Sequence, residues 1–305
     1  MTWRNLAIAY YNKQKEGAKA LDAMTRARTA DPLYPRFLLE YDQLAARLNL
    51  SPAKRLKNME DSLELVKERD DLFLRYITLL NCGGKYQEAY DALMSRRFHP
   101  WEGGEGKVSA QHRFALIHLA QKEMEQQNYP KAVSLLKATL SYPENLGEGK
   151  LPNVPDNQAY YLMGQAYRQM GEDEQAQNCF RLAASGPQEP GSVLYYNDQP
   201  SDFIYYQGLA CRALGDEAGA KKAFHKLISF GEKHVFDQVE YDFFAVSLPE
   251  IEVFQEDISL RNVQYCNYLR ALGSLGLGDT AKAGELFDAI LQKQGDYQGA
   301  LEHRV

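Results

Sequence analysis

The sequence is poor in several features that would place it in a simple class of protein. Its 305 residues contain only 4 cysteines, widely spaced and without a CxxC pair, so neither a disulfide framework nor a zinc or redox motif is indicated. It contains no run of about 18 apolar residues, the minimum for a membrane-spanning helix. Its first residues lack the basic and apolar regions of a signal peptide. A reducing cytoplasm is therefore the expected compartment.

An excess of basic residues is also missing. Lys and Arg number 35 against 41 Asp and Glu, a formal net charge of -6, whereas a nucleic-acid-binding protein carries a basic stripe that neutralises phosphates. The 22 glycines and 12 prolines are ordinary globular usage, and the charged residues, 25% of the chain, are spread along it. Neither a collagen-like nor a disordered chain is therefore expected. The length allows either two ordinary domains or one elongated array.

What the sequence does contain is an internal repeat. Four alanines lie 43, 44 and 44 residues apart, and a similar pattern of large and small residues surrounds each of them: Ala89, Ala132, Ala176 and Ala220. Apolar residues at three- and four-residue spacing predict two helices per unit, with a small residue of the first helix facing the alanine of the second. Four glycines are predicted to end the first helix in the left-handed conformation, which costs glycine least: Gly84, Gly171, Gly215 and Gly278.

This pattern resembles the tetratricopeptide repeat (TPR), whose signature is W-x2-L-G-x2-Y followed by A-x3-F and Pro. In the fifth unit Tyr160, Gly164, Tyr167, Ala176 and Phe180 hold signature positions. The resemblance implies an all-α right-handed superhelix, an α-solenoid of TPR hairpins that forms a single domain over residues 1–305. Repeats are expected near 1–33, 34–67 (degenerate), 70–98, 112–142, 157–186, 201–230 and 262–294, with insertions at 99–111, 143–156, 187–200 and 231–260.

The insertions explain why the period exceeds the roughly 34 residues of a simple TPR. Two of them contain eight-residue loops, 100–107 and 143–150, that both end Gly-Glu-Gly-Lys. These are not phosphate-binding P-loops, because Trp101 stands where the first glycine is needed and Val108 and Leu151 replace Ser or Thr. Their Glu and Lys are expected instead to cap or bridge neighbouring helix ends. The longest insertion has an apolar stretch at 240–249, which predicts an extra helix or a packed loop that covers the groove.

The loop sequences at 96–106, 195–200 and 244–249 also resemble those of large bacterial TPR proteins. In these proteins the repeats follow an N-terminal domain of unknown function with carbohydrate-associated character, which implies a role near sugar metabolism. Trp3 already holds the first signature position, so no capping element precedes the first hairpin, although a terminal repeat needs a polar outer face. The chain is therefore expected to be the C-terminal module of a larger protein, with its own N-terminal domain as a candidate partner.

The first helices of a TPR superhelix line its concave face, so ligand-binding candidates are read from their non-core positions. Tyr161 with Arg168, and Tyr205 with Arg212, are each seven residues apart on one helix face in adjacent repeats, and Tyr268 holds the corresponding tyrosine position. This ladder favours recognition of an acidic peptide, a chain carboxylate or a sugar, through paired arginine hydrogen bonds and tyrosine stacking. Packing of these side chains against their neighbours is the alternative, and the sequence leaves both open.

The insertions should emerge on one edge of the stack and form a lip. Five residues in them are further ligand-binding candidates: His99, Trp101, Glu102, Asn197 and Asp198. Two loop carboxylates at glycosidase separation would be needed for sugar hydrolysis, but loop acids are usually solvated, so no catalytic residue is assigned. The histidines show no metal-ligand spacing, and neither a metal nor a cofactor is expected.

The sequence therefore predicts a non-catalytic protein or peptide interaction scaffold without a nucleic-acid or membrane partner. The alternative is a carbohydrate-binding accessory module that supports a sugar-active enzymatic domain. The first function predicts a groove ligand that is a peptide or the N-terminal domain. The second predicts saccharide binding that is lost when Trp101 or Tyr205 is replaced.

Overall fold

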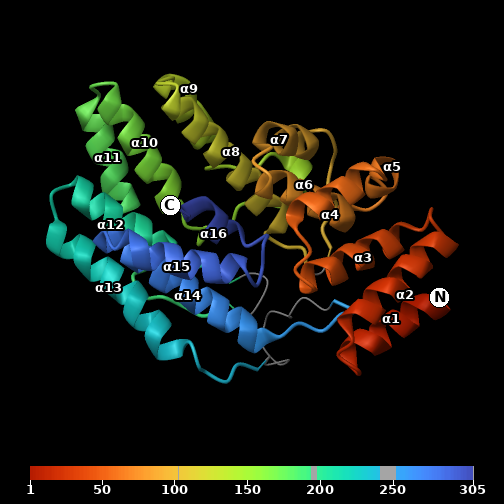
Figure 1. Cartoon of the computed structure of the whole chain (residues 1–305). Coiled ribbons are helices and arrows are strands. Elements are labelled where there is room, and N and C mark those ends of the chain that lie inside the picture. Colours follow the sequence, from red (N-terminus) through yellow and green to blue (C-terminus); the bar gives the residue numbers. More distant parts are fainter. Residues whose placement is uncertain (102, 194–197, 241–251, 305) are drawn as a thin grey trace.

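The computed structural model describes residues 1–101, 103–193, 198–240 and 252–304. In these ranges every regular element is a helix, and the helices form seven consecutive hairpins (Figure 1). Numbered in chain order, the hairpins are α1 (Thr2–Asn12) with α2 (Gly17–Ala30), α3 (Pro35–Arg47) with α4 (Pro52–Glu60), α6 (Asp70–Cys82) with α7 (Tyr86–Met94), α8 (Lys107–Glu125) with α9 (Tyr129–Ala138), α10 (Asn157–Gln169) with α11 (Asp173–Ala183), α12 (Phe203–Ala213) with α13 (Glu217–His234), and α14 (Ile258–Leu277) with α15 (Thr280–Leu291). The chain is thus an all-α solenoid of helical hairpins, as the repeat pattern predicts.

Small residues bring the two helices of a hairpin together. The predicted second-helix alanines are all at most 2% exposed: Ala20, Ala89, Ala132, Ala176, Ala220 and Ala283. In hairpins 5 and 6 the facing small residue is glycine. A Cβ added to Gly164 would lie 2.6 Å from the ring of Phe180, and one added to Gly208 would lie 2.5 Å from the ring of Phe224. The nearest neighbour of each glycine across the helix pair is thus a ring of the second helix and not its alanine, which was the predicted partner.

The turn inside each hairpin uses one left-handed residue. The four predicted glycines have φ between 72° and 88°. In hairpins 1, 2 and 4 the same place is held by Lys15, Asn49 and Gln127, with φ of 58°, 53° and 61°. The turn is therefore common to all seven hairpins of the described chain. The sequence predicts this turn only where the residue is glycine, because lysine and glutamine rarely adopt a positive φ.

Several helix bounds differ from the expected repeats. Helix α8 begins at Lys107, within the predicted insertion 99–111, and α14 begins at Ile258, within the predicted insertion 231–260. The start of α14 is capped by Asp257, whose side chain accepts a hydrogen bond from the Leu260 amide at 3.0 Å. Three short helices were not predicted: α5 (Leu63–Val66), the 3-10 turn η1 (Glu144–Leu146) and α16 (Gln298–His303).

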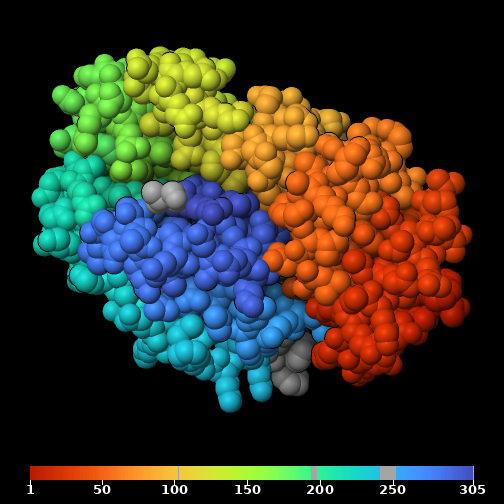
Figure 2. Space-filling model, viewed as in Figure 1, coloured from red at the N-terminus to blue at the C-terminus, as the bar shows by residue number. Residues whose placement is uncertain are grey.

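The stack curls until its last hairpin lies against the first ones, and Figure 2 shows the C-terminal hairpin packed against hairpin 2. The Asn49 side chain fixes this closure, because it donates to the Gln292 carbonyl and accepts from the Gly295 amide, both at 2.8 Å. Residues 252–257 of the longest insertion reach α1 and α3 (Figure 1). The apolar stretch predicted to cover the groove lies outside the described residues apart from Glu240.

In the described ranges, no helix combines the length and the apolar character needed to cross a bilayer.

Candidate functional site

Two of the three tyrosines of the predicted ladder lie under helix α16. Tyr205 and Tyr268 are only 8% and 1% exposed. The ring of His303 in α16 lies 5.6 Å from the ring of Tyr205 and 6.0 Å from that of Tyr268. Tyr161 is partly buried, and its hydroxyl accepts a hydrogen bond from Gln165. Tyr205 and Tyr268 thus stack on the protein itself, and burial raises the pKa of Tyr205 to about 12.

The two ladder arginines join successive repeats. Arg168 donates from Nη2 to the carbonyl of Ala213, at the end of the next first helix, over 2.8 Å, and its guanidinium lies 4.5 Å from the ring centroid of Phe180. Arg212 repeats the arrangement one hairpin later, with 3.0 Å to the carbonyl of Gly276. Each arginine therefore satisfies a carbonyl that the helix end leaves without a partner. This packing accounts for the recurrence, and a ligand-binding role of the ladder stays a prediction.

Helix α16 lies across the first helices of four hairpins. Gln298 accepts a hydrogen bond from Gln111 of α8 at 2.8 Å, and Glu302 accepts one from Gln158 of α10. The hydroxyl of Tyr206, in α12, lies 2.8 Å from Nε2 of His303. The fourth contact is made by Tyr268 of α14, described above. The C-terminal segment therefore occupies the concave groove that the sequence predicts as a ligand site.

One carboxyl beneath α16 is strongly perturbed. Asp202 accepts a hydrogen bond from the Tyr268 hydroxyl at 3.3 Å. The pKa of Asp202 is raised to about 6, chiefly by burial; His303 opposes the rise, and the neighbouring Glu302 adds to it. A carboxyl that titrates close to neutral pH therefore lies beside the contacts that hold α16.

The Glu and Lys of the second Gly-Glu-Gly-Lys loop hold helix ends, as predicted. Glu148 accepts hydrogen bonds from the amides of Gly106 and Ser109 at 2.7 and 3.0 Å, and so caps the N-terminus of α8 with a negative charge. Lys150 donates to the Leu140 carbonyl at 3.2 Å and to Asp156 at 2.6 Å, and so links α9 to α10. Adjacent insertions therefore contact one another, and the bridging interpretation of these residues is confirmed.

The insertions and the first helices enclose a cavity of about 470 Å³ on the concave side. Trp101 reaches it from the insertion 99–111, and Asp198 reaches it from the insertion 187–200. Arg75 and Gln111, on first helices, and Glu252, from the longest insertion, complete a mixed polar wall. The structure thus brings two predicted loop residues, Trp101 and Asp198, to one place, beside helix residues that were not among the candidates.

Of the other three loop candidates, only His99 is described, and it does not line this cavity. His99 lies at the surface, with its side chain 78% exposed and Nδ1 3.1 Å from a carboxylate oxygen of Asp70. Glu102 and Asn197 lie outside the described residues. Binding by any of the five loop residues stays a prediction.

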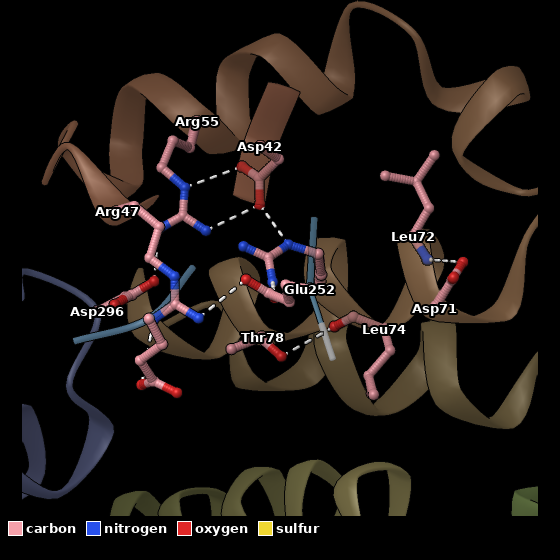
Figure 3. Close-up of polar contacts among 11 residues, drawn as sticks. Asp42, Arg47, Arg55, Asp71, Leu72, Leu74, Thr78, Glu252 and Asp296 are labelled. Carbon is pink, nitrogen blue, oxygen red and sulfur yellow. Dashed lines mark hydrogen bonds and ion pairs between the residues drawn. The ribbon is translucent and has the colours of Figure 1, made fainter. Parts of the chain in front are cut away.

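A buried ion-pair network adjoins the cavity (Figure 3). Asp42 is 1% exposed and accepts hydrogen bonds from Arg55, at 2.9 Å from both Nε and Nη2, and from Arg75 Nε at 2.6 Å. Arg55 also pairs with Asp296, and Arg75 Nη1 lies 3.5 Å from Glu252. Burial alone would raise the pKa of Asp42, but the two arginines outweigh burial and lower it. The network joins hairpins 2 and 3 to the C-terminal segment and the longest insertion.

The same insertion is held to the first hairpin through its backbone. The side-chain amide of Asn12 donates to the Val253 carbonyl at 2.8 Å and accepts from the Gln255 amide at 3.0 Å. Between these two residues, Phe254 is fully buried and meets Tyr11 edge to face, with ring centroids 5.6 Å apart. This contact spans more than 200 residues of sequence, and no local pattern announces it.

Part of the cavity wall does have a sequence signal. Asp71, Arg75 and Thr78 all line the cavity and are spaced by four and three residues, which places them on one face of α6. Reading every face of each first helix, rather than the positions next to the TPR signature, would have found them. The rest of the ion-pair network had no such signal, because Asp42, Arg55 and Glu252 come from three separate elements.

Among the described residues, no group of three or more His, Cys, Asp or Glu side chains is arranged to hold a metal ion.

No protein-family model matches the chain. Among solved structures, it is similar to a tetratricopeptide repeat protein from Parabacteroides merdae at 12% identity, over 99% of this chain and 97% of that one, with a TM-score of 0.46. It is also similar to the C-terminal part of a TPR repeat-containing protein from Cytophaga hutchinsonii at 14% identity, over 98% of each chain, with a TM-score of 0.37. A third similarity is to PilW, a type IV pilus biogenesis factor, at 15% identity, over 75% of this chain and 91% of that one, with a TM-score of 0.40.

Proposed function

We propose that this chain is a non-catalytic interaction module whose concave face binds peptide segments of protein partners. One observation supports this function above the others: the first helices already bind two segments of their own chain there. Asn12 holds residues 253–255 by their backbone, and Gln111, Gln158 and Tyr206 hold α16. A surface that recognises backbone amides and short helices in this way suits peptide ligands.

The test is a peptide array. Purified chain is incubated with an array of 12-residue peptides that vary in net charge and aromatic content, and hits are measured by fluorescence anisotropy. We expect acidic peptides to bind, and to bind more weakly as salt is raised, because arginines line the concave side. If no peptide binds at up to 1 mM, a strength of about 4 kcal/mol, the proposed function is wrong.

A second candidate function is saccharide binding, and the cavity favours it. A volume of about 470 Å³ is within the range of small-molecule sites, and the wall combines one large aromatic face with amide, carboxylate and guanidinium groups. Trp101 offers an apolar ring, and Gln43 and Gln111 offer both donors and acceptors for hydroxyl groups. These groups suit the binding of a neutral ligand that carries several hydroxyl groups.

Thermal-shift screening against mono- to tetrasaccharides tests this second function. A hit in the cavity should be lost in Trp101→Ala and kept in Trp3→Ala, which removes the other tryptophan from the N-terminal helix. Trp101 is a better test residue than Tyr205, because Tyr205 is buried under α16. Saccharide binding that survives Trp101→Ala would exclude the cavity as its site.

The context of the module also belongs to this proposal. In the large bacterial TPR proteins that its loops resemble, a carbohydrate-associated N-terminal domain is a natural partner or, under the second function, the enzymatic domain that is supported. The proposed location is the cytoplasm, because the four cysteines are free thiols, as is usual in a reducing compartment. Co-expression of the chain with such a domain, followed by gel filtration, tests whether the two associate.

A further inference from the structure

The docking of residues 252–256 on hairpins 1 to 3 has the parts of a peptide-recognition site. The first part reads the backbone. Asn12 contacts the carbonyl of Val253 and the amide of Gln255 with one side-chain amide, and so holds the intervening residue in one orientation. On the side of the segment these hydrogen bonds involve main-chain groups only, so a segment of another sequence could also make them if it is extended.

The second part is an aromatic anchor. Phe254 enters the apolar cluster that α1, α2 and α3 build around Ala7, Met24 and Leu44, and it is 0% exposed. Tyr11, beside Asn12, meets its ring edge to face at 5.6 Å. A phenylalanine from a distant segment thus completes the core of the first hairpin, as an aromatic anchor fills a pocket at an interface.

The third part is charge. Glu252 pairs with Arg47 at 3.0 Å and with Arg75 at 3.5 Å, and Glu256 pairs with Arg47 at 3.2 Å. The guanidinium groups come from α3 and α6, and the carboxylates come from the segment, two residues on each side of Phe254. The site therefore presents positive charge to both flanks of the aromatic anchor.

A second cavity lies beside this segment. Its volume is about 200 Å³, and Tyr11, Arg47, Glu256 and Gln264 are among its lining residues. The segment therefore does not fill the space between α3 and α14, and a longer or bulkier peptide has room there.

We propose that hairpins 1 to 3 form a binding site for an extended acidic peptide with a central phenylalanine, supplied by a partner protein. Residues 252–256, Glu-Val-Phe-Gln-Glu, occupy this site as a tethered competitor. The inference rests on the proposed function, since it names the partner chemistry and the regulation of the concave face. A tethered segment acts at an effective concentration of about 1 mM, so it holds the site closed against a partner peptide of similar intrinsic affinity.

The experiment uses a labelled peptide with the sequence of residues 252–257, acetylated and amidated at its ends. It is titrated into the intact chain and into a variant whose residues 252–256 are replaced by a Gly-Ser linker of equal length. Binding to the linker variant should be at least about tenfold tighter than to the intact chain. A peptide with alanine in place of the phenylalanine should not bind the linker variant.

Two matched substitutions locate the site. In the linker variant, Asn12→Ala should weaken binding by about tenfold, because it removes both backbone hydrogen bonds. Asn5→Ala, an exposed amide on the same helix, should leave binding unchanged. The proposal is overturned if the folded linker variant fails to bind at 1 mM, or if Asn12→Ala binds as well as Asn5→Ala.

A further variant covers the case in which the linker variant does not fold. Glu252→Gln with Glu256→Gln keeps the shape of the segment and removes its charge. It should bind the acidic peptide at least about threefold more tightly than the intact chain, since the three partly buried ion pairs of Glu252 and Glu256 with Arg47 and Arg75 are lost. No gain would overturn the competitor role. If peptides from the array bind but ignore Asn12→Ala, the interaction function stands and this inference falls.

Discussion

The buried carboxylate Asp42 allows a sharp test of how the solenoid is held closed. Asp42→Asn keeps the size of the side chain and removes its charge. Two guanidinium groups then face an amide, whose NH2 cannot accept the hydrogen bonds that Arg55 and Arg75 donate to the carboxylate at 2.6 to 2.9 Å. Arg55 is 4% exposed, so water does not replace the lost partner.

The expected cost follows from this burial. Removing one partner of a buried ion pair typically destabilises by about 3 to 5 kcal/mol, and the side chain of Arg75, 23% exposed, favours the lower end. With an unfolding entropy of about 2.1 cal/mol/K per residue, about 3 kcal/mol lowers the Tm of a 305-residue cooperative unit by about 5 °C. If hairpins 2 and 3 open separately from the rest, the loss is concentrated there and is larger.

The change in Tm is measured by thermal unfolding monitored by circular dichroism. Hydrogen exchange of α3, α4 and α6 shows which helices are destabilised. Asp22→Asn is the matched control, because Asp22 pairs with Arg26 at the surface, with side chains 63% and 55% exposed, and should change the Tm little. The pKa of Asp42 is lowered in the folded state, so its contribution is present above the unfolded pKa of about 4 and is lost only as pH falls through the lower folded value. The difference between Asp42→Asn and the parent should therefore persist at pH 5. A Tm loss below about 1 °C, or no larger than that of Asp22→Asn, would refute the reasoning.

Three further outcomes are expected. Gly164→Ala should destabilise by about 1 to 3 kcal/mol, because its Cβ would lie 2.6 Å from a ring carbon, whereas Gly284→Ala, with nothing within 4 Å, should stabilise by about 0.5 to 1 kcal/mol in chemical denaturation. The pKa of Asp202 is raised to about 6, so ionisation costs stability progressively between about pH 4 and pH 6, and Asp202→Asn should remove that pH dependence and raise the Tm at pH 7.5. An equal pH dependence in the variant would contradict this account. Glu148→Gln should cost about 1 kcal/mol through the cap of α8, and Glu105→Gln should cost less than half of that; equal losses in the two variants would show that the cap is not responsible.

The helical repeat is legible in the sequence because hairpin formation is local. A small residue, an alanine and a ring recur at fixed spacing and mark the two helices that pack, although Gly164 meets the ring of Phe180 rather than the predicted alanine. The capping role of Glu148 was also accessible, because the same loop recurs 43 residues apart and P-loop chemistry is excluded by its residues. In each case the interacting groups lie within one repeat or in neighbouring repeats.

The sequence by itself determined the class of fold and its construction from helical hairpins. Only the tertiary structure decided what the concave face holds. Tyr205 and Tyr268 of the predicted ladder are covered by α16, and Phe254 fills the core of a hairpin more than 200 residues away. These contacts depend on how far the stack curls, and the curl is the sum of small rotations between hairpins that no single repeat encodes. The periodicity of the sequence therefore predicts the helical hairpin. Contacts between the two ends of the stack close it and so determine the binding surface.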